Sequence, residues 1–199
     1  MNRFEEIKNS FTNIPDEVIR LWIEPISLKE GWPVKNGWDV RVTGEDFLFW
    51  NDSNWQKKEV DLSKLDYSRL YFDMIRGLLD AYIYNVNNSY KDLLGVDGKK
   101  RFQSALMYIS KNGTFPQPPV LCVNEIGKYE ILDGNHRFFA FKIAEEAYYE
   151  GLRKDNNMMG IKRPDLIQEL WICHPNWSNS KKAEDRNRLR GQGLGFIID

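Results

Sequence analysis

Apolar side chains recur every three or four residues along several stretches of the chain, the spacing that gathers them on one face of an α-helix. The longest stretch predicts a helix over residues 61–83, and another predicts a helix over residues 99–110. Gly113 follows the second stretch, at a position where helices often end. Closer to the N-terminus, residues 13–22 predict a short helix that Pro25 terminates.

Short apolar runs bounded by turn-forming residues predict strands in the second half of the chain. Residues 120–123 and 129–132 predict two strands joined by a turn at residues 124–127. A helix is then expected over about residues 135–151, because apolar side chains again recur at spacings of three and four. Residues 168–173 predict a further strand.

A hairpin is expected in the N-terminal half, where the strand-like residues 38–42 and 47–50 flank a turn sequence at residues 43–46. Along the whole chain, helices and strands are mixed without a regular strand–helix–strand alternation, which favours an α+β fold over a doubly wound α/β fold. We therefore expect one domain over residues 1–177, with the helix and hairpin as an N-terminal extension, and a polar basic tail over residues 178–199.

The composition fits a folded protein and restricts its classes of partner. Of the 199 residues, 42% are hydrophobic, and the formal net charge of −1 provides no overall positive field to attract nucleic acid or an anionic membrane. No apolar stretch is long enough to span a bilayer, and the N-terminus lacks the apolar core of a signal peptide. We therefore expect a cytoplasmic protein without a membrane partner.

The few cysteines and histidines exclude some kinds of site. Cys122 and Cys173 each lie in an apolar run and are interpreted as buried, reduced thiols that form no disulfide framework. His136 and His174 are too few for a histidine-rich zinc site, and the adjacency of Cys173 and His174 is not a zinc-ligand spacing.

One short motif, Asp133-Gly134-Asn135-His136-Arg137, follows a predicted strand and opens a predicted helix. The first backbone N–H groups of a helix lack intrahelical acceptors, and with the helix dipole they favour a bound anion, typically phosphate. Gly134 allows a ligand to approach the backbone closely, and an anion would neutralise cationic His136 and Arg137 in the first turn. Asp133 is placed to cap the helix, to orient His136 or to hold a Mg²⁺ ion shared with phosphates. The alternative is an ordinary Asp-Gly hairpin turn followed by surface side chains.

Several segments together resemble the ParB-like domain, which shares its fold with sulfiredoxin and with free-serine kinases of archaea. The family pattern is a helix ending near a glycine, a Q-P-x-x-V run, a strand pair, and a glycine turn with a His-Arg or Arg-Arg pair that opens a helix. The matching segments here are Ile109-Ser110-Lys111-Asn112-Gly113, Gln117-Pro118-Pro119-Val120, Asp133-Gly134-Asn135-His136-Arg137 and Ala140. The last motif also resembles the DGQHR variants of DNA-modification systems, with Asn135 in place of Gln. The resemblance spans residues 102–144 and implies a ParB/sulfiredoxin-like fold, a small mixed sheet packed with helices.

This resemblance implies a nucleotide, with ATP as the expected one, whose phosphates would contact Gly134, Asn135, His136 and Arg137. A Mg²⁺ ion would bind at Asp133, and the implied catalytic residues are Asp133, His136 and Arg137. Asn135 stands where sulfiredoxin has its nucleophilic Cys, and an amide cannot attack phosphorus or sulfur, so the chain is not a sulfiredoxin. The short segment after Gly151 does not fit the helix-turn-helix and dimerisation region of a full partition protein.

Three functional hypotheses follow. The leading one is a nucleotide-binding enzyme, an ATPase or a phosphotransferase that acts on a small-molecule hydroxyl. Glu24, Glu30 and Glu125 are then unranked candidates for a general base. The second hypothesis is a DNA-associated ParB-like module, or a nuclease, of a plasmid, phage or DNA-modification system, whose binding would depend strongly on salt. The third is a non-catalytic interaction protein that keeps the pocket of the fold.

Overall fold

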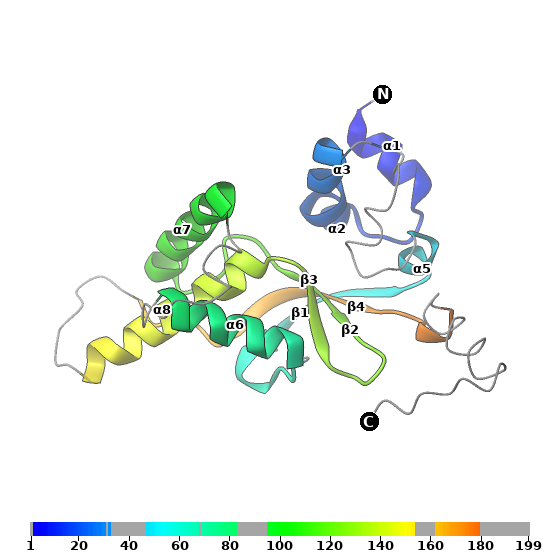
Figure 1. Ribbon diagram of the computed structural model, residues 1–199. Coiled ribbons are helices and arrows are strands. Elements are labelled where there is room, and N and C mark those ends of the chain that lie inside the picture. Colours follow the sequence, from blue (N-terminus) through cyan, green and yellow to red (C-terminus); the bar gives the residue numbers. More distant parts are fainter. Residues whose placement is uncertain are drawn as a thin grey trace. The chain divides into compact units, whose positions relative to one another are not determined.

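The structure, a computed structural model, describes residues 2–30, 32, 47–67, 69–82, 95–153 and 162–179. In this part of the chain helices occur together with a four-stranded sheet, which confirms the α+β class (Figure 1). None of the described helices is long and apolar enough to cross a membrane. Most of the expected basic tail, residues 180–199, lies outside the described residues, as does the predicted strand at residues 38–42.

We expected one domain over residues 1–177, and contacts within the chain group it into two compact units. The first unit comprises Met1–Gln56, Cys122–Gly127 and Ile172–Asp199. The second comprises Lys57–Leu121 and Lys128–Trp171, and it contains the Asp133–Arg137 motif.

The N-terminal helices of the first unit are α1 (Arg3–Ser10), α2 (Asp16–Val18), the π-helical η1 (Ile19–Ile23) and α3 (Glu24–Glu30). The prediction that Pro25 ends the helix is wrong, because Pro25 lies in the first turn of α3. The N–H of Glu24 donates to the carbonyl of Ile19, five residues back. In a regular α-helix the proline ring would clash with the carbonyl four residues earlier. The wider π-helical turn just before Pro25 relieves that clash, and the helix continues.

The predicted strand at residues 47–50 is also wrong, since these residues belong to helix α5 (Phe47–Asn51). Trp50 is only 1% exposed and packs edge-on against Trp22, with ring centroids 5.3 Å apart. A run of aromatic residues suits a buried strand and a buried helix equally well. Here the helical turn is closed by Ser53, whose hydroxyl donates to the carbonyl of Phe49 at 3.0 Å.

The four strands are β1 (Asn54–Asp61), β2 (Val120–Val123), β3 (Tyr129–Asp133) and β4 (Ile167–His174), in the order β1-β4-β2-β3. The predicted strands at residues 120–123, 129–132 and 168–173 are confirmed as β2, β3 and β4, and the turn between β2 and β3 is confirmed by the positive φ of Gly127. Strand β1 was missed. It is an edge strand with mostly exposed, charged side chains, and it carries no apolar alternation to reveal it.

The helices of the second unit are the 3₁₀-helix η2 (Leu62–Lys64), α6 (Arg69–Tyr82), α7 (Gly95–Asn112) and α8 (Asn135–Arg153). The helix expected over residues 61–83 begins later than predicted. Asp61 caps η2 through its side chain, and Tyr67 forms a parallel bridge with Tyr129 before α6 starts. The other two helices were predicted at their correct places and are longer than expected.

Aromatic side chains form the core between α7, α8 and the sheet. The helix α8 packs along α7 and also contacts α6 (Figure 1). Phe139 of α8 stacks on Phe102 of α7 at 4.6 Å, and Phe115 contacts Phe138 and Phe141 at 5.1 and 5.3 Å. Burying each such ring contributes about 1.5–3 kcal/mol relative to leaving it exposed.

The two cysteines are buried and form no disulfide, as the sequence predicts. Burial raises the pKa of the Cys173 thiol to about 12, so the thiol stays protonated at neutral pH. A thiol in this state is a poor nucleophile.

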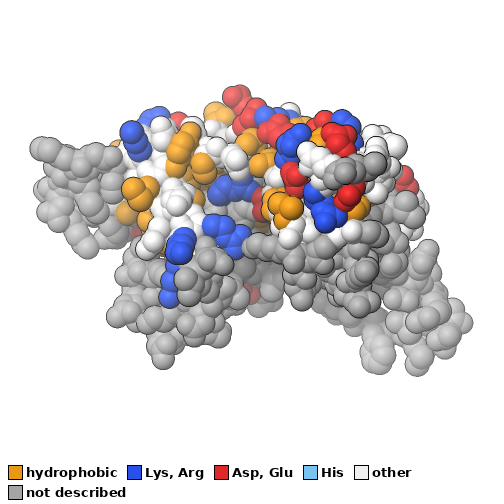
Figure 2. Space-filling view, turned by 90° about the horizontal axis from the view of Figure 1, so that it is seen from above, with side chains coloured by type: hydrophobic (Ala, Val, Ile, Leu, Met, Phe, Trp, Pro, Cys, Tyr) orange, Lys and Arg blue, Asp and Glu red, His pale blue; other side chains and the backbone are white. Residues whose placement is uncertain are grey.

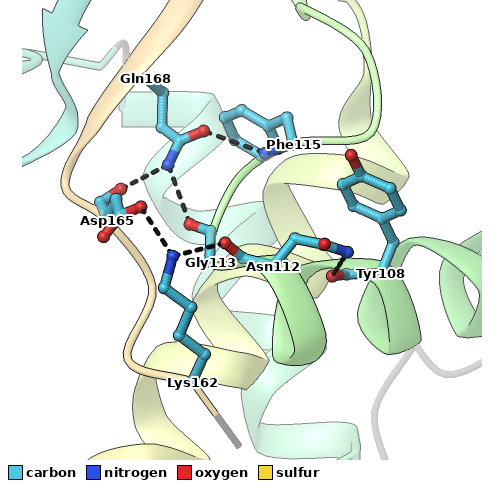
Figure 3. Close-up of polar contacts among 7 residues, drawn as sticks. All are labelled: Tyr108, Asn112, Gly113, Phe115, Lys162, Asp165 and Gln168. Carbon is cyan, nitrogen blue, oxygen red and sulfur yellow. Dashed lines mark hydrogen bonds and ion pairs between the residues drawn. The ribbon is translucent and has the colours of Figure 1, made fainter.

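The C-terminal end of α7 is joined to the segment before β4 by a polar network (Figure 3). The amide of the buried Gln168 accepts a hydrogen bond from the N–H of Phe115 at 3.0 Å and donates to the carbonyls of Gly113 and Asp165. Lys162 donates to the carbonyl of Asn112 at 2.8 Å, which also places a positive charge at the negative end of the helix dipole. The positive φ of Gly113 confirms the expected end of α7. This network holds the start of the loop that leads from α7 to β2.

Candidate functional site

The Asp133–Arg137 motif forms a strand–glycine–helix junction. Strand β3 ends at Asp133, Gly134 has φ +103°, and α8 begins at Asn135. The carbonyl of Gly134 accepts the first helical hydrogen bond, from the N–H of Phe138 at 2.9 Å. The predicted junction is therefore confirmed, and the alternative of an Asp-Gly turn between two strands is wrong.

Glycine is required at position 134 by both conformation and space. Its φ lies in the region that side chains with a Cβ rarely adopt. A Cβ at this position would lie 2.9 Å from Cβ of Pro119 and 3.1 Å from Nε and Nη2 of Arg137. We expected this glycine to let a ligand approach the backbone. The structure shows that on the Cβ side the close neighbours are Pro119 and the Arg137 guanidinium.

The side chain of Arg137 turns back over the junction. Its Nη2 forms an ion pair with Oδ2 of Asp133, and its Nη1 donates to the carbonyl of Gln117 at 3.1 Å. The side chain is only 13% exposed. Gln117 belongs to the loop between α7 and β2, so Arg137 ties that loop to the end of β3 and the start of α8. Arg137 thus maintains the shape of the junction.

Burial and charge oppose each other at the two paired groups. Burial raises the pKa of Asp133 above its ordinary value, and the guanidinium of Arg137, the N–H of Gly134 and the charge of Arg101 offset this only in part. Burial likewise lowers the pKa of Arg137, and the neighbouring Asp133 carboxylate offsets this only in part. A guanidinium titrates so far above neutral pH that Arg137 stays charged, and the ion pair with it keeps Asp133 an acceptor.

His136 is neutral in this environment, which corrects the expectation of a cationic side chain there. Burial, followed by the charges of Arg101 and Arg137, lowers the pKa of His136 to about 4. A neutral imidazole has one N–H donor and one acceptor nitrogen. At neutral pH it can therefore donate a hydrogen bond to an anion without contributing a positive charge.

Arg101 is the residue of this site that the sequence did not reveal. It lies on α7, is exposed, and acts electrostatically on both Asp133 and His136. Nothing in its neighbourhood along the chain marks it, because only the packing of α7 against α8 brings it to the motif. The charges of Arg137 and Asp133 balance each other, so among the described residues of the junction Arg101 supplies the excess positive charge.

The junction is suited to bind an anion. The first helical hydrogen bond of α8 is donated by the N–H of Phe138. The N–H groups of Asn135, His136 and Arg137 therefore have no acceptor within the helix. Asn135 is exposed at the first helical position, so a ligand can reach this end of the helix from solvent. The helix dipole and Arg101 act in the same sense, since both favour negative charge there.

A Mg²⁺ ion fits the junction less well than an anion does. The described residues contain no group of three or more His, Cys, Asp or Glu side chains able to hold a metal ion. Asp133 is a single carboxylate already engaged by Arg137. Mg²⁺ at one carboxylate would depend on phosphate oxygens and water for its other ligands. Magnesium binding at Asp133 therefore stays a prediction.

The three candidate general bases stay predictions. Glu24 is half-buried and Glu125 is exposed, and both belong to the first compact unit, whereas the junction belongs to the second. The side chain of Glu30 lies outside the described part of the chain.

Compared with known proteins, the chain matches no family model, no curated protein and no solved structure. The resemblance to ParB-like domains therefore stays a prediction from the sequence, and the structure adds only that its segments fall after α7, before β2 and at the strand–glycine–helix junction.

Proposed function

We propose that the junction at Asp133–Arg137 binds the phosphates of a nucleotide, with ATP the expected one, and that the protein is a ParB-like nucleotide-dependent enzyme. One observation carries the proposal. The uncapped N–H groups at the start of α8 coincide with an excess positive charge from Arg101, while the motif's own arginine is neutralised by Asp133. A phosphate completes both the hydrogen bonding and the charge balance of this arrangement.

Each residue has a distinct part in this proposal. The backbone N–H groups of Asn135, His136 and Arg137 donate to phosphate oxygens, and the neutral imidazole of His136 supplies one more N–H donor. Arg101 adds an electrostatic attraction, and Arg137 maintains the turn through Asp133 and Gln117. Donors fixed in this way stabilise the negative charge of a phosphoryl group in transfer to water or to a hydroxyl.

A DNA-associated function has less support. The net charge of the chain is −1. On the face seen in Figure 2, basic side chains of the described residues alternate with acidic ones on the right, and on the left they lie apart from one another, between hydrophobic and uncharged side chains. A duplex-binding surface presents a basic patch or stripe. The DNA hypothesis would be favoured over a nucleotide by a binding constant that falls steeply with salt concentration.

Titration calorimetry with ATP, with and without Mg²⁺, tests the proposal. We expect Arg101→Gln to weaken ATP binding about tenfold, because it removes one charge-assisted interaction with phosphate worth about 1.5 kcal/mol. Lys111→Gln is the matched control, since Lys111 is an exposed cation at the other end of the same helix. The control should bind ATP like the wild type, and circular dichroism should show both variants folded.

The proposal fails if ATP, ADP and inorganic phosphate all leave the unfolding temperature of the wild-type protein unchanged, because a ligand that binds only the folded state must raise it. It also fails if Arg101→Gln and Lys111→Gln bind ATP equally well. Turnover of ATP by the wild type, absent from a folded His136→Ala variant, would further support an enzyme over a non-catalytic binding protein.

A further inference from the structure

The second compact unit contains an open cavity of about 730 Å³ that the junction does not use. Residues of η2, the segment after it, α6, the β2–β3 turn and α8 line it, and none of them belongs to Asp133–Arg137. Its apolar wall consists of Leu62, Leu65, Ile75 and Leu79. Small-molecule sites have volumes of about 300–1,000 Å³ and are mostly apolar, with few polar groups that orient the ligand. The cavity meets both criteria.

The charged side chains of the cavity leave an excess of positive charge. Lys128 forms an ion pair with Asp66, and Lys142 forms one with Glu145 at 2.9 Å. Arg76, which also lines the cavity, has no carboxylate partner within the described ranges. A guanidinium presents a planar fork of N–H donors that matches a carboxylate. Arg76 is therefore the cation available to a ligand.

Tyr67 also lines the cavity, and its hydroxyl lacks a partner in the described part of the chain. The hydroxyl of Tyr67 is buried and makes no hydrogen bond with any described residue. The backbone of Tyr67 forms a parallel bridge with Tyr129, and its ring packs edge-on against Phe138 with ring centroids 6.0 Å apart. A buried hydroxyl without a partner costs free energy, and its usual partner is a water molecule or a ligand acceptor. Burial raises the pKa of Tyr67, so the hydroxyl keeps its proton and remains a donor.

We infer that this cavity binds a small organic acid with an apolar body. The body packs on the four aliphatic side chains, and the carboxylate accepts hydrogen bonds from the guanidinium of Arg76. A rotation of the Tyr67 ring that uncovers its buried hydroxyl supplies a second donor. Lys128 and Lys142 also line the cavity, and their charges are balanced by Asp66 and Glu145. The inference is independent of nucleotide binding at the junction, because the two sites share no residue.

Three compounds with one apolar body and different head groups test the inference: 4-phenylbutyrate, 4-phenylbutan-1-ol and 4-phenylbutylamine. Each is titrated into the ¹⁵N-labelled full-length protein and followed by the amide resonances. We expect the acid to shift resonances of residues that line the cavity and to bind at least about tenfold more tightly than the alcohol, because the acid alone makes a charge-assisted hydrogen bond. The amine should bind most weakly.

Two variants and one control locate the head group. Arg76→Gln should reduce the affinity for the acid to that for the alcohol, whereas Arg163→Gln, an exposed arginine outside the cavity, should leave it unchanged. Tyr67→Phe should weaken acid binding about two- to tenfold, the loss expected for one neutral hydrogen bond. It should not lower the unfolding temperature of the ligand-free protein, because the hydroxyl it removes has no protein partner.

Equal binding of the acid and the alcohol would overturn the assignment of an acid site, as would an Arg76→Gln variant that binds the acid like wild type. Absence of any shift in the cavity resonances at millimolar concentrations would overturn the cavity as a ligand site and leave water as the partner of Tyr67. Neither result bears on the binding of ATP at the junction, which is measured separately.

Discussion

Replacing Gln168 by Met should strongly destabilise the second unit. The Gln168 side chain is 3% exposed and supplies the acceptor for the N–H of Phe115 and a donor to the carbonyls of Gly113 and Asp165. Methionine has nearly the same length and fills the same space, so Gln168→Met removes the polar contacts without opening a large cavity. The substitution thus isolates the contribution of the network shown in Figure 3.

The size of the loss in stability depends on which polar groups lose their only hydrogen-bond partner. The carbonyl of Gly113 still accepts from the N–H of Asp165 at 2.8 Å, so it stays satisfied. The N–H of Phe115 is left buried without an acceptor, at a cost of about 1–3 kcal/mol. The lost bond to the Asp165 carbonyl adds about 1 kcal/mol. The sum of about 2–4 kcal/mol is large against a typical stability of about 5–15 kcal/mol. It corresponds to a drop in Tm of roughly 4–16 °C for a chain of this length.

Urea denaturation followed by circular dichroism measures the loss, and amide hydrogen exchange reports on Phe115 directly. We expect the Phe115 amide to lose protection in Gln168→Met more than its neighbours do. Gln103→Met is the matched control, because Gln103 is exposed on α7 and its replacement should change the stability by less than about 0.5 kcal/mol. If Gln168→Met unfolds within about 0.5 kcal/mol of wild type and Phe115 keeps its protection, the network does not hold the loop and the reasoning is refuted.

Three further predictions concern the junction. Gly134→Ala should lower the free energy of unfolding, measured by urea denaturation, by about 2–4 kcal/mol, because the new side chain meets both an unfavourable φ and Pro119. In the control Gly127→Ala, φ is +80° and the space around the new Cβ is open, so the loss should be only about 1 kcal/mol. Equal losses would show that the contact with Pro119 does not matter. Arg137→Lys should weaken ATP binding by about ten- to a hundredfold although the charge is kept, because an ammonium cannot bind the Asp133 carboxylate and the Gln117 carbonyl at the same time. Unchanged affinity in calorimetry would contradict this prediction. The pKa of His136 is about 4 in the folded state, against 6.5 for an unperturbed histidine, so between these pH values the unfolded state binds more protons. The contribution of His136 to stability is therefore complete above pH 6.5 and is lost as the pH falls toward 4. His136→Gln should make the stability less dependent on pH in that window, and an unchanged slope would refute the neutral assignment.

The local pattern of apolar residues and glycines was sufficient to predict the helices and strands around the motif. The strands β2 and β3, the turn at Gly127 and the helices α7 and α8 were all predicted, because their apolar spacing and their glycines act over a few residues. The pattern failed where neighbours distant in sequence decide the structure. Strand β1 is polar and exists as the edge partner of β4, and α5 is helical although its aromatic run suits a strand. The late start of α6 depends on the bridge between Tyr67 and Tyr129.

The candidate site divides in the same way. The sequence by itself determined that a glycine turn would join a strand to a helix at Asp133–Arg137 and would leave the helix N-terminus available to an anion, because backbone geometry and dipole depend on local order alone. Only the tertiary structure decided the charges. It paired Arg137 with Asp133, made His136 neutral by burial, and brought Arg101 from α7 as the excess cation. Electrostatic interactions depend on distance and on exposure to water, and the packing of α7 on α8 sets both.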